Sequence, residues 1–400
     1  MASTAVGVWV GAGGRHESAK LSGISHFIEH MLFKGTRRRS AAEISQAVEG
    51  VGGYLNAFTD EEHTCFYARA HGSRWGDLLA VLTDMFTNSR LTPGDIERER
   101  AVILEEIAMY RDQPAELVHD VLNQLQFPRH PLGRPVIGSP STLRGLGRNE
   151  LRTHLASHYT SGATLIAAAG NLRHEDFVRE SAPLAAQFRT GPRPDFERFE
   201  RPPAGPAVRL VVRDVEQANL GLGLRAVSRH DPRRHALRLL NVILGENMSS
   251  RLFQVVREDH GLTYNIQSSA TTWADVGDLV VSAGLDPSEV EKTLVLVIRE
   301  LDRLMKRAPS MAELSRAKDY VLGQFELSME STENHMMWLG EQWLNHGEFV
   351  PPSTIRERIT RVTAPEISAL ARTLFTPDRR SLAIVSPRKQ FSGLNRILES

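Results

Sequence analysis

The feature that most constrains this chain is the run His26-Phe27-Ile28-Glu29-His30. On a helix, His26 and His30 are four residues apart and project from one face, so two imidazole nitrogens can reach one metal ion. Glu29 lies three residues after His26 and points to nearly the same side, beside the metal rather than on it. The spacing therefore predicts a metal site on a helix.

The residues around this run indicate a buried helix over 24–33. Its apolar members are Ile24, Phe27, Ile28, Met31 and Leu32. Unpaired His and Glu side chains are costly in such a setting, so a metal site is favoured over solvated or capping histidines. The order His-x-x-Glu-His is the inverted form of the zinc-peptidase motif, in which two His bind zinc and Glu handles protons.

Composition limits the fold and the partners. A chain of 400 residues usually forms two domains. Lys+Arg and Asp+Glu both total 48, so the formal net charge of +0 does not favour binding to nucleic acid or an anionic membrane. We find no apolar stretch approaching the ~20 residues of a membrane span. The single cysteine, Cys65, cannot form an internal disulfide, and without a signal peptide we expect a cytoplasmic protein.

The element pattern is similar in the two halves of the chain. Periodicity predicts, in the first half, strands over 5–10, 54–59, 63–70 and 163–169 and helices over 24–33, 41–51, 75–88, 93–112, 117–127 and 151–159. Ser40 and Glu43 predict a capping box before the helix over 41–51. In the second half, strands are predicted over 208–212, 219–224 and 278–283, and helices over 234–244, 251–258, 287–307, 311–329 and 334–346. We therefore predict an N-terminal zinc-binding domain over 1–189, a proline-rich linker over 190–206 and a homologous domain without metal over 207–400.

A catalytic zinc site needs a third protein ligand and an open position for water. The predicted helix over 93–112 carries four glutamates, namely Glu97, Glu99, Glu105 and Glu106. Glu99 and Glu106 are two turns apart and share a face, with Val102 and Ile103 at its edge. One of these two carboxylates could be the third ligand, and the other could orient a ligand His.

The chain resembles the pitrilysin/insulinase-type inverzincin zinc metallopeptidases, in particular the mitochondrial-processing-peptidase-like subfamily. The resemblance is carried by residues 23–36, 52–59, 99–107, 130–135 and 249–253 and by Arg257 with 261–264, and it extends over nearly the whole chain. It implies an α+β fold of two homologous α/β domains. Each would hold a mostly antiparallel sheet packed by helices, and the two would close like a clamshell over an extended peptide.

The resemblance also implies roles for individual residues. His26, His30 and Glu106 would bind one Zn²⁺ per chain, Glu99 would support a ligand His, and Glu29 would be the general base. The implied substrate contacts are Phe33, Asn56, Ala57, Glu116, Asp120, Arg257 and Tyr264. Of these, Asn56 and Ala57 would pair with the peptide backbone, and Arg257 with Tyr264 would stabilise the oxyanion. Glu116 and Asp120 would read arginine in presequence-like substrates.

Two other functions are the alternatives, and the intact His26, Glu29, His30 and Glu106, with no cysteine nearby, disfavour both. A non-catalytic peptide-binding or scaffold subunit would have a damaged metal motif and a long glycine-rich loop where residues 245–248 are short. A structural zinc site would close with four ligands, preferably Cys. The expected partners are a peptide or unfolded protein substrate and a second copy or homologous subunit. Relatives begin with a strand before residue 5, so we expect either a truncated start or a first sheet that lacks an edge strand.

Overall fold

The computed structural model describes residues 2–200 and 205–400, so residues 201–204 of the predicted linker lie outside the described part. The chain forms two compact units, each assembled from separated segments. Unit 1 comprises Met1–Met109, Arg134–Glu197 and Glu326–Phe349, and unit 2 comprises Tyr110–Gly133, Arg198–Phe325 and Val350–Ser400. The predicted division of the chain into two domains, joined by a linker over 190–206, stays a prediction.

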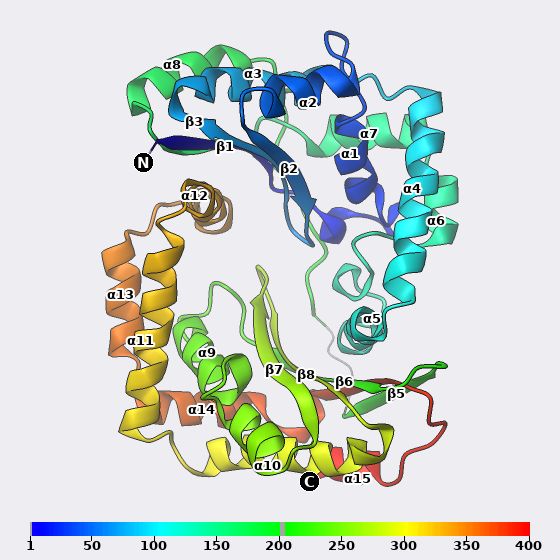
Figure 1. Ribbon diagram of the computed structural model, residues 1–400, viewed down its shortest axis with the longest axis vertical. Coiled ribbons are helices and arrows are strands. Elements are labelled where there is room, and N and C mark those ends of the chain that lie inside the picture. The colour runs from blue at the N-terminus through cyan, green and yellow to red at the C-terminus, as the bar shows by residue number, and fades with distance from the viewer. Residues whose placement is uncertain (1, 201–204) are drawn as a thin grey trace. The chain divides into compact units, whose positions relative to one another are not determined.

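The sheet of unit 1 has the order β2-β3-β1-β4, and every neighbouring pair is antiparallel. Its strands are β1 (Ser3–Val10), β2 (Tyr54–Thr59), β3 (Thr64–His71) and β4 (Thr164–Gly170). The helices of this unit are α1 (Ile24–Leu32), α2 (Ala41–Glu49), α3 (Trp75–Asn88), α4 (Pro93–Arg111, which ends in unit 2), α6 (Pro140–Gly145), α7 (Arg148–His158), α8 (His174–Ala185) and α12 (Thr332–His346). Figure 1 shows α3 and α8 on one side of this sheet and α12 on the other.

Strand β1 explains why both faces of this sheet are covered. Its residues alternate between the two faces, as the pleat requires. Val6, Val8 and Val10 belong to a buried cluster with residues of α1 and α3. Ala5 and Trp9 belong to a second cluster that includes residues of α12. Helix α1, which carries the expected metal ligands His26 and His30, therefore packs on the first of these two clusters.

The sheet of unit 2 has the order β5-β9-β6-β8-β7 and is antiparallel except for the parallel pair β5-β9. Its strands are β5 (Ala207–Val212), β6 (Ala218–Ala226), β7 (Thr263–Thr272), β8 (Gly277–Leu285) and β9 (Arg380–Ser386). The helices are α5 (Pro114–Gln126), α9 (Arg234–Asn241), α10 (Val290–Lys306), α11 (Met311–Ser328, which ends in unit 1), α13 (Pro352–Arg361), α14 (Ala364–Leu374) and α15 (Leu394–Glu399). Two π-helical segments, Val242–Glu246 and Phe253–Asp259, follow α9.

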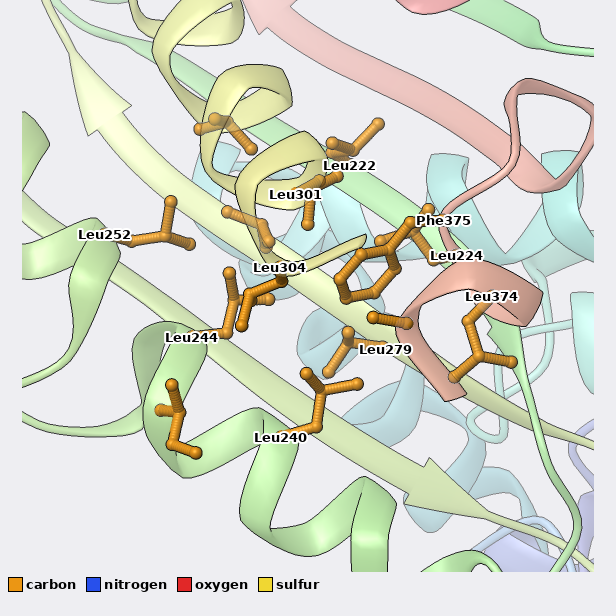
Figure 2. Packing of buried hydrophobic residues seen from close by; sticks show 14 of the residues in the cluster. Leu222, Leu224, Leu240, Leu244, Leu252, Leu279, Leu301, Leu304, Leu374 and Phe375 are labelled. Carbon is orange, nitrogen blue, oxygen red and sulfur yellow. The ribbon is translucent and has the colours of Figure 1, made fainter. Parts of the chain in front are cut away.

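The core of unit 2 lies between one face of its sheet and the helices α9, α10 and α14. Figure 2 shows Leu222, Leu224 and Leu279 of the sheet facing Leu240, Leu301 and Leu304. The other face packs on α5. Val118 and Leu122 of α5 are the side chains that a Cβ added at Gly221 of β6 would meet first. Each sheet is thus covered on both faces, and α5 in unit 2 takes the place that α12 has in unit 1.

The predicted α+β class, with two mostly antiparallel sheets, is confirmed. The Ser40–Glu43 capping box is also confirmed, since each side chain accepts from the other residue's backbone N–H. Strands β7 and β9 were not among the strands predicted from the sequence. Within the described residues, the sheet of unit 1 has one strand fewer than that of unit 2. None of the helices in the described residues combines the length and apolar character of a bilayer span.

The packing of α12 on β1 gives a test of the fold. A Cβ added at Gly340 would lie 2.3 Å from Cε2 of the buried Trp9 ring, so we expect Gly340→Ala to destabilise the protein by about 1–3 kcal/mol. At Gly323 on α11, a Cβ would meet nothing within 4 Å. There the better helix propensity of alanine should stabilise by about 0.5–1 kcal/mol. Urea unfolding of both variants measures the two effects, and equal shifts of the same sign would contradict this packing.

Candidate metal centre

Helix α1 is oriented by its apolar side chains. Ile24, Phe27, Ile28, Met31 and Leu32 are 0–1% exposed and form one continuous stripe. Burial of this stripe fixes the rotation of the helix about its axis. His26, Glu29 and His30 are only partly buried, because they project from the remaining face. The predicted helix over 24–33 is confirmed, with Phe33 as its C-cap.

The N-terminus of α1 is held by a residue outside the helix. The carboxylate of Glu17 accepts hydrogen bonds from the backbone N–H groups of Gly23 and Ser25, both at 2.8 Å. Burial raises the pKa of Glu17 to about 7, against the lowering effect of these two bonds. A carboxylate at this end also interacts favourably with the helix dipole. Glu17 therefore fixes where the metal-motif helix begins.

The three expected metal ligands converge between α1 and α4. Glu106 Oε2 lies 3.5 Å from His30 Nε2 and 3.9 Å from His26 Nε2. One ligand atom from each residue lies within 4.8 Å of the other two. Glu105, the neighbouring carboxylate, is exposed, whereas Glu106 is half-buried. Ile96, Glu99, Ile103 and Ile107 form the buried face of α4, but Val102 is 50% exposed and does not belong to it.

The donor set fits a zinc ion. Four ligands placed tetrahedrally about 2.1 Å from zinc lie about 3.4 Å from one another, close to the two distances from Glu106. Burial, together with the neighbouring His30, lowers the pKa of His26 to about 4. This leaves its imidazole neutral, which is the form that binds a metal. The hydrogen bond with His30 lowers the pKa of Glu106, so its carboxylate is charged.

Glu99 contacts the far side of His30. Its Oε2 accepts from His30 Nδ1 at 3.2 Å, and its Oε1 lies 2.9 Å from Lys34 Nζ. Burial acts to lower the pKa of His30, but the hydrogen bonds with Glu106 and Glu99 outweigh it and raise the value. Because Nδ1 faces Glu99, Nε2 is the nitrogen left to face Glu106. The position of Glu99 suits the supporting role predicted for it.

Glu29 lies next to the three candidate ligands and does not belong to their cluster. Thr59, at the end of β2, donates its hydroxyl proton to Glu29 Oε2 at 2.6 Å. Burial raises the pKa of Glu29, and the hydrogen bond from Thr59 works against this rise. One oxygen of the carboxylate is thus anchored by Thr59.

Three predicted substrate contacts also belong to unit 1. Phe33 packs against Phe66, with ring centroids 6.2 Å apart, so Phe33 is also a partly buried residue at the edge of the hydrophobic core. Asn56 and Ala57 lie on β2, which is an edge strand of the sheet. The side chain of Asn56 donates to the Tyr54 hydroxyl at 2.7 Å and accepts from the Ala57 N–H at 2.9 Å. These residues lie on an edge where a further strand could pair.

The other predicted substrate contacts belong to unit 2. Arg257 and Tyr264 lie together, because the guanidinium carbon of Arg257 is 4.7 Å from the centroid of the Tyr264 ring. Tyr264 is 82% exposed. Glu116 and Asp120 lie on α5, and burial raises the pKa of Asp120 to about 6. Their assignment as substrate contacts stays a prediction.

Sequence reasoning missed three side chains that touch this site or its helix, namely Glu17, Lys34 and Thr59. Thr59 and Lys34 fall inside runs that match the family, but nothing in their own spacing indicates a contact with Glu29 or Glu99. Glu17 precedes α1 by seven positions, beyond the reach of the local capping patterns. All three are recognised only when the fold brings them to the site.

An α+β fold with a His-His-Glu cluster and an adjacent glutamate defines the class of inverted-motif zinc peptidases. Family models agree with this class. Residues 1–140 match the insulinase model of peptidase family M16, and residues 145–321 match the model of the M16 inactive domain. The chain belongs to peptidase family M16.

Relatives of similar length support this assignment. An uncharacterized zinc protease of Streptomyces coelicolor is 38% identical, over 97% of this chain and 85% of the relative. An uncharacterized zinc protease of Bacillus subtilis is 35% identical, over 96% of this chain and 93% of the relative. The names of both relatives imply a zinc cofactor.

Solved structures agree on the fold. A peptidase M16 inactive domain from Pseudomonas fluorescens superposes with a TM-score of 0.89 at 21% identity, covering 97% of this chain and 94% of that one. A protease from Helicobacter pylori superposes with a TM-score of 0.91 at 19% identity, covering 97% and 95%. At these identities the likeness concerns the fold alone.

The choice between the neighbouring carboxylates gives a test of the metal site. We expect Glu106→Gln to lose most of its zinc, because a neutral amide replaces a charged ligand, whereas the exposed Glu105→Gln should retain it. His30→Ala should lose the metal as well. Zinc per chain, measured by elemental analysis after dialysis, distinguishes these outcomes. Equal zinc in the Glu105 and Glu106 variants would contradict the proposed ligand set.

Proposed function

We propose that this chain is a zinc-dependent endopeptidase that hydrolyses extended peptides or presequence-like segments. The observation that carries the proposal is the convergence of His26, His30 and Glu106, with the carboxylate of Glu29 beside them. Three protein ligands leave one position of a tetrahedral site open, as catalytic zinc requires. A structural zinc site would need a fourth ligand, and the cluster found among the described residues has three members.

The chemistry is divided between the metal and Glu29. His26, His30 and Glu106 would hold a zinc ion, which would supply Lewis-acid chemistry toward a water and a peptide carbonyl. Glu29 takes a proton from the attacking water as the new C–O bond forms. It then returns that proton to the amine nitrogen as the C–N bond breaks, so no group remains attached to the protein. The Thr59 hydroxyl holds one oxygen of Glu29 in place for both transfers.

The edge strand β2 supports the proposed substrate class. An extended peptide can add to β2 through main-chain hydrogen bonds, which selects unfolded segments rather than folded domains. Asn56 and Ala57 would offer these contacts, and Phe33 would line a nearby subsite. The predicted roles of Arg257 and Tyr264 at the oxyanion, and of Glu116 and Asp120 in reading arginine, complete the proposal. A homodimer or a homologous partner subunit, and a cytoplasmic location, also stay predictions.

Removing the general base separates metal binding from catalysis. We expect Glu29→Gln to keep its zinc but to lose at least about 100-fold in kcat, because an amide cannot accept the proton of water. Glu49→Gln, at the exposed end of α2, is the matched control and should cleave like the wild type. Cleavage of a peptide library by purified protein, with and without chelator, gives the rates and the cleavage sites.

Two results would contradict the proposal. A fully active Glu29→Gln variant with normal zinc would show that another group moves the proton. A wild-type protein that binds peptides but cleaves none, with zinc or without, would instead identify a non-catalytic peptide-binding subunit.

A further inference from the structure

The ion pair between Lys34 and Glu99 joins the end of α1 to α4 directly behind a metal ligand. Glu99 is 6% exposed, and its two oxygens have different partners. Oε2 accepts from His30 Nδ1 at 3.2 Å, while Oε1 lies 2.9 Å from Lys34 Nζ. The three side chains therefore form one continuous series, from the ammonium through the carboxylate to the imidazole.

From this series we infer that Lys34 is a positioning residue of the metal site. It holds the Glu99 carboxylate in the orientation that turns His30 Nε2 toward Glu106, and so raises the affinity for zinc. The inference rests on the proposed function only in requiring that His26, His30 and Glu106 bind zinc. Lys34 itself has no ligand role, because an ammonium has three donors and no lone pair.

The backbone at Lys34 is well fixed, as a positioning role requires. Its N–H donates to the Met31 carbonyl at 3.1 Å, in the last turn of α1. The next residue, Gly35, has a φ of 109°, which only glycine adopts without strain, and the chain turns away there. A Cβ at Gly35 would also lie 3.1 Å from the backbone carbonyl oxygen of Arg39, so the turn is closely packed. The Lys34 side chain thus reaches Glu99 from a defined starting point.

The charges of the site give a second reason for a cation here. Three carboxylates, those of Glu29, Glu99 and Glu106, lie around the two imidazoles. A divalent ion would balance two negative charges and leave the third without compensation. Lys34 supplies the remaining positive charge at Glu99, the most buried of the three. A buried charge that has lost its partner is strongly unfavourable, so the pair should matter more than an exposed salt bridge.

Zinc affinity tests the inference without any use of peptidase activity. We expect Lys34→Met to raise the zinc dissociation constant about 10-fold, the lower end of the range found when the direct hydrogen-bond partner of a ligand His is removed. Lys34→Arg keeps the charge and should recover most of the affinity. Lys20→Met, the same change at an exposed lysine of the 3-10 helix Ala19–Leu21, should bind zinc like the wild type. Competition with a chromophoric chelator measures all four proteins.

A double-mutant cycle identifies the route of the effect. If Lys34 acts through Glu99, then Lys34→Met should add no further loss of zinc affinity to a Glu99→Gln chain. Thermal unfolding of the metal-free proteins separates this role from a merely structural one. A lower unfolding midpoint with unchanged zinc affinity in Lys34→Met would overturn the inference, and so would additive losses in the cycle.

The proposed function and this inference can fail separately. A wild-type chain that binds no zinc overturns both. A wild-type chain that binds zinc, with Lys34→Met binding it equally well, overturns the inference alone. Zinc binding that depends on Lys34 in a protein without peptidase activity supports the inference and contradicts the proposed function.

Discussion

The rest of the site depends on the packing of α1 against the core of unit 1. Burial of its apolar stripe leaves one rotation of the helix available, and in that rotation His26 and His30 face Glu106 on α4. Glu17 fixes the start of the helix, and the Gly35 turn follows its end. The metal geometry is therefore set by a hydrophobic constraint, since three polar groups alone would not hold this arrangement in water.

The two units exchange helices along the sequence. The first half of the chain supplies α5 to the sheet of unit 2, and the second half supplies α12 to the sheet of unit 1. Both helices pack closely on their sheets. A Cβ at Gly340 of α12 would collide with Trp9 of β1, and a Cβ at Gly223 of β6 would collide with Gln126 of α5. A chain cut in the linker would separate each sheet from a helix that buries one of its faces.

The metal helix and the capping box could be predicted from the local spacing of residues, whereas the α+β fold class was implied by the resemblance to a known family. Strand β7 was missed because its polar residues mask any alternation, with Ile266 its main buried apolar side chain. Periodicity cannot distinguish the continuous apolar run of β9 from a buried helix. The contacts of Glu17, Lys34 and Thr59 could not be predicted, because they join segments that come together only in the folded chain. For the same reason, the sequence could not predict which of the two sheets α5 and α12 would pack against.

The central claim is that His26, His30 and Glu106 bind one zinc ion. An anomalous difference map at the zinc absorption edge, from crystals of the wild-type chain, tests it most directly. The account predicts one strong peak per chain, at about 2.0–2.2 Å from one atom of each of the three side chains. A peak at other residues, or a Glu106 side chain turned away from the two imidazoles, would contradict it.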